Sequence, residues 1–228
     1  MSYLIFRGVS TLDIGVFAAK MPAHAKPRVR YTEWKIAGRD GTLKTEDGYD
    51  AFDVTCQLRM IRNDVYTRDL INAWADGDGL LVTSDMPDRA WQASVLGEVK
   101  YERDVHGWQC YDVAKVTFRC QPGMREAVPS VYTFTQSGAL LNPGTMTAKP
   151  KIVVTGSGNC SFIVGGNSIT LNNVTSPVTL DCDAGYVYTE KGAAEMVGDF
   201  PVLPLGQSDV ILGSGVSKIE IAPNWRWL

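Results

Sequence analysis

The stretch from residue 142 to residue 212 decides the fold. It reads N-P-G-T at 142–145, A-K-P-K-I-V-V-T-G-S-G at 148–158 and F-P-V-L-P-L-G-Q-S-D-V-I-L at 200–212. Short runs that alternate apolar and polar residues fill it, and turn-forming residues separate most of them. It contains no histidine, no nucleophile motif and no metal-ligand spacing. So many turns and so few reactive groups indicate a structural segment rather than a catalytic one.

Alternating apolar pairs and triplets continue through the second half of the chain. They are Ile152/Val154, Phe162/Val164, Ile169/Leu171, Val178/Leu180/Cys182 and Ile219/Ile221. Gly165-Gly166 and Asn172-Asn173 occupy positions typical of hairpin turns, and Gly156-Ser157-Gly158 is interpreted as a hairpin turn rather than a phosphate-binding loop. Strands at this spacing predict an antiparallel β-sandwich. We expect most of its aromatic residues, including Tyr186 and Tyr188 on one strand face, to lie in the core.

The first half contains two long alternating runs. Every second residue of 52–60 is apolar, which predicts a strand with one buried and one exposed face. Residues 108–120 repeat the pattern with one interruption at Asp112, where we expect a bulge. Weaker strand signals cover Tyr3–Phe6, Val29–Ile36, Leu80–Thr83, Trp91–Leu96 and Val99–Tyr101.

One helix is predicted, over residues 64–77. Asn63 or Asp64 can cap its start, Leu70, Ile71 and Trp74 fall on one face, and Gly77 can end it. Turn signals then cluster in residues 121–150, and we expect the domain boundary near residues 122–135. The sequence therefore predicts a mainly-β protein. Residues 1–128 form a β-barrel-like domain with one α-helix, and residues 129–228 form an antiparallel β-sandwich.

Composition excludes several classes of protein. The chain has 228 residues, of which 45% are hydrophobic, and a net charge of −3, so it is neither a disordered segment nor a general nucleic-acid binder. The apolar run Tyr3–Phe6 is too short for a signal peptide, and no run approaches the roughly 20 residues of a membrane span. We therefore expect a soluble protein made in a cytoplasm, without membrane insertion. Its cysteines, which we expect to be buried small hydrophobes, are Cys56, Cys110, Cys120, Cys160 and Cys182.

The order of several turn motifs matches a known family. The second half, with Asn142-Pro143-Gly144, Pro150 before the strand Lys151–Thr155, Gly156-Ser157-Gly158 and Phe200-Pro201 followed by Pro204-Leu205-Gly206, resembles the C-terminal domain of the distal tail proteins (Dit) of long-tailed phages. In the first half, Gly38-Arg39-Asp40-Gly41 is similar to the R-D-G turn of that family. Phe118-Arg119-Cys120-Gln121-Pro122 is similar to the strand that closes its N-terminal domain. These motifs span nearly the whole chain.

The resemblance implies a structural role. It implies a ring-forming N-terminal domain, a homohexameric ring and a galectin-like C-terminal β-sandwich. The ring would be a hub at the tip of a phage or prophage tail, assembled in the cytoplasm of the host bacterium. The expected partners are the tail tube protein, the tail-associated lysin or fibre hub and receptor-binding proteins. DNA would pass through the ring without specific binding, and the basic residues Lys26, Arg28, Arg30 and Lys35 are interpreted as a solvated loop or as intersubunit contacts.

Two groups of residues are candidates for assembly. Arg39, Asp40 and Gly41 form either a plain hairpin turn or a contact in the ring. Trp225 and Trp227, near the C-terminus, are interpreted as an anchor that packs on the protein's own core, on the N-terminal domain or on a neighbouring subunit. A sugar-binding platform is the alternative for this pair.

No catalytic residue, cofactor or metal ion is predicted. His24 and His106 lack a second histidine at a metal-ligand spacing and are interpreted as surface residues. Asp181 and Asp183 could bind Ca²⁺ but are interpreted as a solvated face beside a turn. The alternative functions are a carbohydrate-binding module for attachment to a host surface, and a hydrolase, for which the sequence provides little support.

Overall fold

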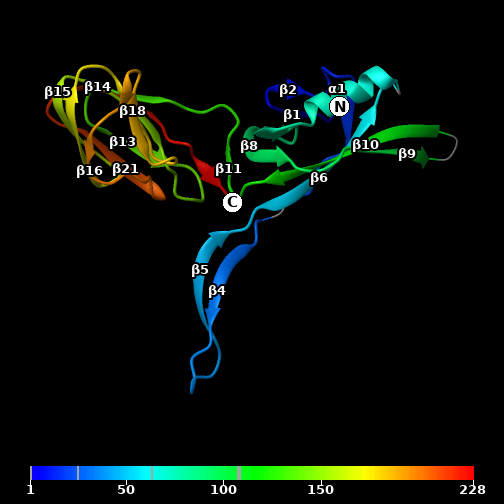
Figure 1. Cartoon of the computed structure of the whole chain (residues 1–228), viewed down its shortest axis with the longest axis horizontal. Coiled ribbons are helices and arrows are strands. Elements are labelled where there is room, and N and C mark those ends of the chain that lie inside the picture. Colours follow the sequence, from blue (N-terminus) through cyan, green and yellow to red (C-terminus); the bar gives the residue numbers. More distant parts are fainter. Residues whose placement is uncertain (1, 25, 63, 107–108) are drawn as a thin grey trace. The chain divides into compact units, whose positions relative to one another are not determined.

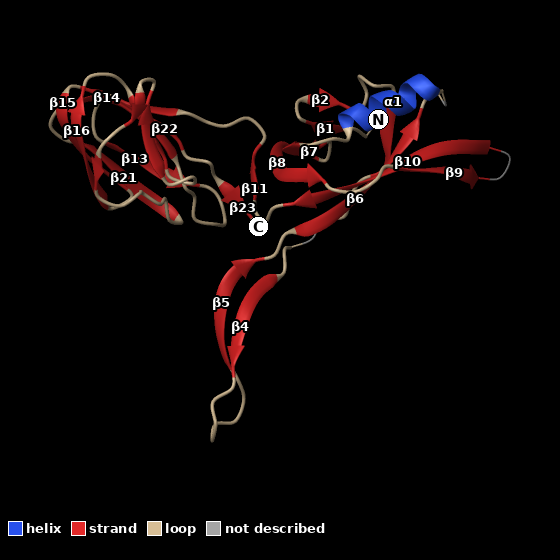
Figure 2. Cartoon of the chain, viewed as in Figure 1, coloured by secondary structure: helices blue, strands red, loops and turns tan. Residues whose placement is uncertain are grey.

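The structure, a computed structural model, describes residues 2–24, 26–62, 64–106 and 109–228, without the side chains of residues 104–111 and 193. Trp108 and the side chains of His106 and Cys110 therefore lie outside the described residues. The protein is mainly β, and one of its antiparallel sheets curls into a half barrel. Figure 2 shows α1 as the single helix among the described elements. The chain divides into two compact units, Met1–Ala127 with Leu228 and Val128–Trp227.

The first unit consists of one large antiparallel sheet, one helix and a separate hairpin (Figure 1). The order of strands in the sheet is β2–β1–β7–β8–β10–β6–β3, with β9 paired to β10 and β11 paired to β8. The elements are β1 (Leu4–Phe6), β2 (Val9–Ser10), β3 (Val16–Lys20), β4 (Val29–Trp34), β5 (Leu43–Tyr49), β6 (Phe52–Met60), α1 (Val65–Trp74), β7 (Asp78–Thr83), β8 (Met86–Val95), β9 (Lys100–His106), β10 (Gln109–Cys120) and β11 (Met124–Glu126).

Helix α1 begins where the sequence predicts a cap. The carboxylate of Asp64 accepts a hydrogen bond of 2.7 Å from the backbone N–H of Thr67, which satisfies a donor that the first turn leaves open. The helix ends at Trp74, and Ala75 has already left the helical conformation. It is therefore shorter than the predicted 64–77, because the chain must turn at Gly77 (φ 76°) to enter β7.

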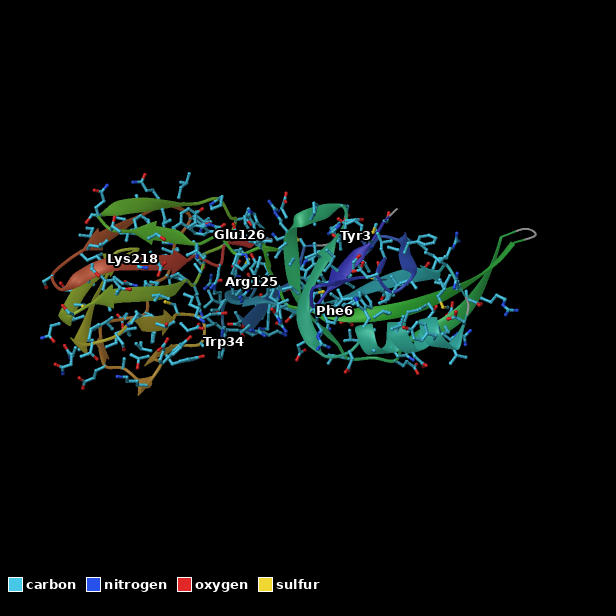
Figure 3. The ribbon with its side chains drawn as sticks, turned by 90° about the horizontal axis from the view of Figure 1, so that it is seen from above. Tyr3, Phe6, Trp34, Arg125, Glu126 and Lys218 are labelled. Atoms are coloured by element: carbon cyan, nitrogen blue, oxygen red, sulfur yellow. The ribbon has the colours of Figure 1, made fainter. Side chains whose placement is uncertain are left out.

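An aromatic triangle holds the helix on the sheet. The ring of Phe6, labelled in Figure 3, lies edge-on to those of Trp74 and Phe118, at centroid distances of 5.9 and 5.0 Å. Trp74 and Phe118 are 5.8 Å apart, and the indole N–H of Trp74 donates to the carbonyl of Val9. Edge-to-face geometry is the favoured arrangement of aromatic rings. The alternation of the sequence thus becomes a packed core beneath α1.

The long predicted strands of the first unit are confirmed. β6 covers residues 52–60, and β10 runs to Cys120 with Ala114, Val116 and Phe118 buried. The bulge expected at Asp112 is wrong, because the register against β9 continues without a shift through the pair Asp112–Arg103. Asp112 keeps its place in the alternation by pairing with that arginine, 3.5 Å away.

The second unit is a sandwich of two antiparallel sheets. One sheet has the order β12–β22–β14–β17–β18–β19 and the other β13–β21–β15–β16–β20. The strands are β12 (Tyr132–Phe134), β13 (Gly138–Asn142), β14 (Lys151–Gly156), β15 (Gly158–Val164), β16 (Asn167–Val174), β17 (Val178–Asp181), β18 (Tyr186–Thr189), β19 (Gly192–Ala193), β20 (Met196–Val197), β21 (Gly206–Leu212), β22 (Val216–Ala222) and β23 (Arg226–Trp227). The predicted alternating residues, from Ile152 to Ile221, are buried between the sheets.

The turns of this unit are only partly as predicted. Gly165 and Gly166 both have positive φ and form the two-residue turn of the β15–β16 hairpin. Asn172-Asn173 is not a turn: it lies inside β16, where the register shifts opposite Asn159. Asn173 has φ 54°, and its N–H is bound by the side chain of Asn159, so the local deviation is a bulge.

Gly156-Ser157-Gly158 is not a hairpin either. It connects β14 in one sheet to β15 in the other. A Cβ atom on Gly156 would lie 2.2 Å from the carbonyl oxygen of Gly215. Only glycine therefore allows these two segments of the backbone to approach this closely. The segment is the corner at which the chain changes sheets.

Candidate assembly surface

A two-stranded arm is the most exposed part of the first unit. β4 and β5 pair only with each other, as Figure 1 shows for the two blue strands. Most of their residues are exposed. An isolated two-stranded hairpin is at best marginally stable in water, because nothing covers either of its faces. An arm of this length is therefore expected to gain stability from a partner.

The arm has two chemically different faces. Near the tip, the pairs Trp34–Leu43 and Thr32–Thr45 place uncharged side chains on one of them, which we call the uncharged face. Closer to the base of the arm, the hydroxyl of Thr32 donates to the carboxylate of Asp47. Trp34, labelled in Figure 3, is 58% exposed, and Leu43 is 45% exposed. Large apolar side chains seldom gather on a free surface, so this face has the character of a binding surface.

The opposite face is charged and covered by its own contacts. Lys44 lies 3.1 Å from Glu33 and 4.5 Å from the centre of the Tyr31 ring. The hydrogen bond and charge of Glu33 raise the pKa of Lys44, which keeps it cationic. The charged side chains of this face thus contact one another and water. The apolar side chains of the uncharged face have no other layer packed on them.

The candidate residues Arg39, Asp40 and Gly41 lie at the tip of this arm. Residues 35–42 connect the strands, and the N–H of Arg39 donates to the carbonyl of Ile36 to close a turn. Gly41 has φ 81°, which a side chain would strain. The tip is therefore a loop of residues 35–42 rather than a plain hairpin turn, and it presents the three residues to solvent. Their contact in a ring stays a prediction.

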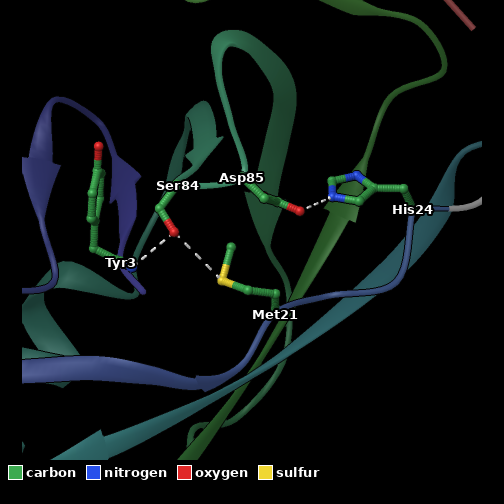
Figure 4. Close-up of polar contacts among 5 residues, drawn as sticks. All are labelled: Tyr3, Met21, His24, Ser84 and Asp85. Carbon is green, nitrogen blue, oxygen red and sulfur yellow. Dashed lines mark hydrogen bonds and ion pairs between the residues drawn. The ribbon is translucent and has the colours of Figure 1, made fainter. Parts of the chain in front are cut away.

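The segment that leads into the arm is held down at His24 (Figure 4). The Nε2 atom of His24 lies 2.6 Å from a carboxylate oxygen of Asp85, and its ring stacks on Trp91 at 5.0 Å. Ser84 links the same region by accepting from the N–H of Tyr3 and donating to the sulfur of Met21. Because His24 lies between β3 and β4, these contacts fix one leg of the arm.

Asp85 is set up to remain ionised. Burial alone would raise the pKa of this carboxyl, but hydrogen bonds from Thr83 and His24 outweigh it and lower the pKa. The side chain is 40% exposed, so the pair is partly screened by water. The contact is thus a positional one rather than a large source of stability.

A pocket opens beside α1, and none of its lining residues belongs to the arm. Its volume is about 310 Å³, and its lining is mostly apolar: Phe6, Arg7, Val9, Ile14, Leu70, Ala73 and Trp74. Arg7 is oriented by its hydrogen bond to the carbonyl of Asp76, 2.8 Å away. Leu70, which the sequence places on the buried helix face, lines this pocket instead of the core.

The two candidate tryptophans of the C-terminus lie in different environments. Trp225 is 1% exposed and belongs to the core of the second unit. Its indole N–H has no acceptor among the described residues, although a buried tryptophan usually finds one. Trp227 is half-buried, and its N–H donates to the carbonyl of Pro143 at 3.2 Å. An anchoring role for the pair stays a proposal.

Asn142 connects the motifs that carry the sequence resemblance. Its side-chain oxygen accepts from the N–H of Gly144, and its amide donates to the carbonyls of Met146 and Pro204. A Cβ on Gly144 would lie 2.3 Å from the carbonyl of Arg226, so the C-terminal strand passes directly over this glycine. Asn142-Pro143-Gly144 is thus the point where residues 200–206 and the C-terminus meet.

The candidate metal ligands and the cysteines of the described residues have structural surroundings. The described residues contain no group of three or more that could hold a metal ion. Asp181 accepts from the N–H of Ala184 within a turn, and Asp183 pairs with Lys149. Cys56, Cys120, Cys160 and Cys182 are buried, and burial raises the pKa of each thiol.

One prediction about the aromatic residues was wrong. Tyr186 and Tyr188 share a strand face, but that face is the outer one, and Tyr186 is 53% exposed. Val187 points inward instead. Two tyrosines in an alternating run do not reveal which face is buried, because tyrosine suits both environments.

Sequence reasoning also missed residues. Trp34 and Leu43 have the alternation of ordinary strand residues, and the sequence gives no signal that their face is left open. Asn142 was noted for its turn chemistry, but its distant acceptors could not be inferred.

In the described residues, no helix is both long and apolar enough to cross a membrane.

Comparison with known proteins finds similarity in structure rather than in sequence. No family model matches the sequence, and no curated protein does. The fold matches the crystal structure of the Dit protein (gp 19.1) of phage SPP1, described as a paradigm of the hub adsorption apparatus in phages that infect Gram-positive bacteria. The TM-score is 0.70 and the identity 15%, with 97% of this chain and 98% of that chain covered. The baseplate of phage P2, in its activated conformation with Ca, matches with a TM-score of 0.48 and 10% identity over 96% of this chain and 97% of that chain. The chain therefore has the fold of the SPP1 Dit protein over nearly its whole length.

Proposed function

We propose that this chain is a structural hub protein of a phage or prophage tail tip. Identical copies form a ring, which joins the tail tube to the tail-associated lysin or fibre hub and to receptor-binding proteins. The ring is a homohexamer in this proposal, located at the tip of the virion tail and assembled in the cytoplasm of the host bacterium. DNA passes through it without specific binding, and the protein is not an enzyme.

The arm is the observation that carries the proposal. A two-stranded hairpin that exposes the apolar pair Trp34 and Leu43 is poorly stable alone and suits insertion into another protein. Repetition of one head-to-tail contact between identical copies closes a ring, and closure creates a channel. The likeness in fold to SPP1 Dit, over nearly all of both chains, supports the same kind of role.

The test is the mass of the protein in solution, with negative-stain images of the same sample. We expect rings of one size, either from the protein alone or after the tail tube protein is added. A protein that stays monomeric at every concentration and forms no ring with the tube protein would contradict the proposal. Specific binding of a glycan by the second unit would instead support the carbohydrate-binding alternative.

A variant with a shortened arm tests whether the arm makes the contact in the ring. Residues 32–47 are replaced by Asn-Gly, which makes a two-residue turn between the remaining strand ends. The arm pairs only with itself, so the sheet of the first unit should fold unchanged, as circular dichroism would check. Loss of the ring in this variant supports the arm as the contact, and an intact ring would exclude it.

A further inference from the structure

We propose that the pocket beside α1 binds the C-terminal residue of a partner protein. Arg7 pairs with the terminal carboxylate, and the apolar lining holds an aliphatic side chain. The lining comes from α1 and from residues 6–14, on the β1–β2 hairpin and the turn that follows it (Figure 1). The inference goes beyond the hub function, because the site lies within the first unit of a single chain and needs no ring.

Arg7 occupies a turn position that does not suit it. Phe6 pairs with Val9 in the β1–β2 hairpin, so Arg7 and Gly8 are the two residues of its turn. Their φ values are 53° and 80°, and two positive values characterise a type I′ turn. Asparagine, aspartate and glycine are favoured at the first of these positions, whereas a long side chain there strains the backbone. The turn alone therefore does not account for an arginine.

Two glycines at the entry to β7 leave space for the Arg7 side chain. A Cβ atom on Gly79 would lie 2.5 Å from the Cγ atom of Arg7, and one on Gly77 would lie 3.4 Å from its Nη1 atom. That Nη1 atom donates to the carbonyl of Asp76 at 2.8 Å, and the backbone N–H of Arg7 donates to the carbonyl of Leu80. The guanidinium is thus positioned at the pocket without a ligand, which is the preorganisation that favours binding.

The guanidinium keeps most of its binding capacity free. The bond to Asp76 uses one of its five N–H groups, and no carboxylate of the described residues forms an ion pair with it. No other described residue of the lining is charged. Asp69 and Asp76 are exposed and lie outside the lining, so water and salt screen their repulsion of an anion. Since a guanidinium binds a carboxylate through two parallel hydrogen bonds, the charge of the pocket is complementary to a carboxylate.

The rest of the lining suits one aliphatic side chain. Leu70 and Ala73 line the pocket from α1, and Ile14 lines it from the segment after β2. The indole N–H of Trp74 donates to the carbonyl of Val9 at 2.9 Å, which fixes the ring between these residues. The volume of about 310 Å³ lies at the lower end of the range for pockets that bind small molecules, roughly 300–1,000 Å³. The pocket therefore has room for about one residue.

A chain end is the occupant that brings both groups into so small a volume. In a C-terminal residue the carboxylate and the side chain are attached to the same Cα atom. An acidic residue inside a chain has its carboxylate on one residue and the apolar group on another, so the pair needs a larger site. Capture of a terminal carboxylate is one of the recurring modes of peptide recognition.

The ligands of the experiment are four capped peptides. Acetyl-Gly-Ser-Gly-Leu with a free carboxylate is the probe, and its C-terminal amide lacks the charge. Acetyl-Gly-Ser-Gly-Ser with a free carboxylate lacks the aliphatic side chain. Acetyl-Gly-Leu-Glu-Gly-amide presents leucine and a carboxylate inside a chain. Saturation-transfer difference NMR with the full chain measures the Kd of each peptide, because this method observes the peptide whatever the size of the protein assembly.

Two variants of the full chain each have a matched control. Arg7→Asn removes the guanidinium and creates Asn-Gly, a pair that suits a type I′ turn, whereas Arg62→Asn removes a charge outside the lining. Ala73→Phe fills the pocket from an exposed helix position, and Val65→Phe places the same ring on the same helix outside the lining. Circular dichroism and thermal unfolding check the fold of each variant.

We expect the probe to bind at least about tenfold more tightly than the other three peptides, since a hydrogen bond to a charged group and a buried leucine each contribute about one power of ten or more. Arg7→Asn and Ala73→Phe should each weaken binding of the probe by at least about tenfold, and their controls should stay within about twofold of the wild type. Arg7→Asn should melt no lower than the wild type, which separates a role in binding from a role in folding.

Four results would overturn the inference. They are no binding of the probe to the wild type, equal binding of the probe and its amide, equal binding of the peptide with the internal carboxylate, and wild-type affinity in Arg7→Asn or Ala73→Phe. None of them bears on the ring, which is measured by mass and images. A wild type that binds the probe but forms no ring contradicts the hub function alone, so the two failures are distinguishable.

Discussion

The side-chain amide of Asn142 donates to the backbone carbonyl of Pro204, 3.1 Å away and 62 residues later in the chain. The same amide donates to the carbonyl of Met146, and the side-chain oxygen accepts from Gly144. Because Asn142 is only 7% exposed, water does not readily replace these bonds. One asparagine thus holds together two stretches that look like independent turns in the sequence.

Asn142→Asp should destabilise the second unit. The carboxylate has the same shape as the amide but cannot donate, so it faces backbone carbonyls without a proton between them. The expected cost is about 2–4 kcal/mol in the free energy of unfolding, measured by urea titration. The control is Asn224→Asp, since Asn224 makes one exposed bond to the carbonyl of Lys149. Equal stability of the two variants would contradict the role of Asn142.

Trp225→Ala should cost more than Trp227→Ala. Trp225 lies in the core at 1% exposure, and truncation leaves a cavity worth about 3–5 kcal/mol. Trp227 is only half-buried, and its loss should cost about 1–2 kcal/mol through its bond to Pro143 and partial packing. Thermal and urea unfolding of both variants checks the order. The reverse order would place the C-terminal anchor at Trp227.

Trp225→Phe separates packing from hydrogen bonding. The indole N–H of Trp225 has no acceptor among the described residues, so phenylalanine loses volume but no bond. We expect this variant to recover at least about half of the stability lost in Trp225→Ala, since a smaller cavity costs less. A loss as large as that of alanine would indicate a bond that burial alone does not explain.

Removal of the Asp85 carboxylate should have an effect that depends on pH. The folded pKa of Asp85 is lowered, so its contribution is complete above the unfolded pKa of about 3.9 and is lost as pH falls through the folded value. Near pH 6, Asp85→Asn should therefore lower the free energy of unfolding by about 0.5 kcal/mol, a small amount because the pair is exposed. The loss is measured as a lower melting temperature. The difference from the wild type should shrink below pH 4.

Asp88→Asn is the control for this measurement, because it removes a nearby exposed carboxylate that lacks the contact with His24. A difference that grows on acidification, or one of equal size in both variants, would show that the bond between His24 and Asp85 does not act as described. Hydrogen exchange at residues 21–28 should rise in Asp85→Asn alone, since that segment loses its attachment.

The buried cysteines should resist alkylation in the folded protein. Burial raises the pKa of Cys56, Cys120 and Cys182 to about 12 and also raises that of Cys160. At pH 8 a thiol of pKa 12 is a thiolate in about one molecule in ten thousand, and the thiolate is the reactive form. Peptide mapping after iodoacetamide treatment should show labelling of these four residues only after unfolding. Labelling of one in the folded state would indicate local opening.

Much of the fold is predictable from local patterns. The alternation in β6 and β10, the cap at Asp64 and the Gly165-Gly166 turn each depend on neighbours in sequence, and each is found where the sequence predicts it. Local patterns fail where a distant segment decides. Asn172-Asn173 becomes a bulge through Asn159, and Gly156–Gly158 becomes a corner through Gly215.

The candidate site was the least predictable part. The sequence gives Trp34 and Leu43 one face of a strand pair, since alternation determines which side chains share a face. It does not tell whether another layer covers that face, because cover comes from segments far away in the chain or in another chain. Arg39–Gly41 was predicted as a turn, whereas its position at the end of an unsupported arm follows from the tertiary structure alone.

By itself the sequence determined that this protein is mainly β, that it carries one capped helix and that its second half is a sandwich. The physical reason is that the period of the side chains and the conformational limits of glycine, proline and asparagine act over a few residues. Only the tertiary structure decided which strands share a sheet, which turns are corners and which face of the arm stays open. Those outcomes depend on packing and hydrogen bonds between segments tens of residues apart, such as Asn142 with Pro204.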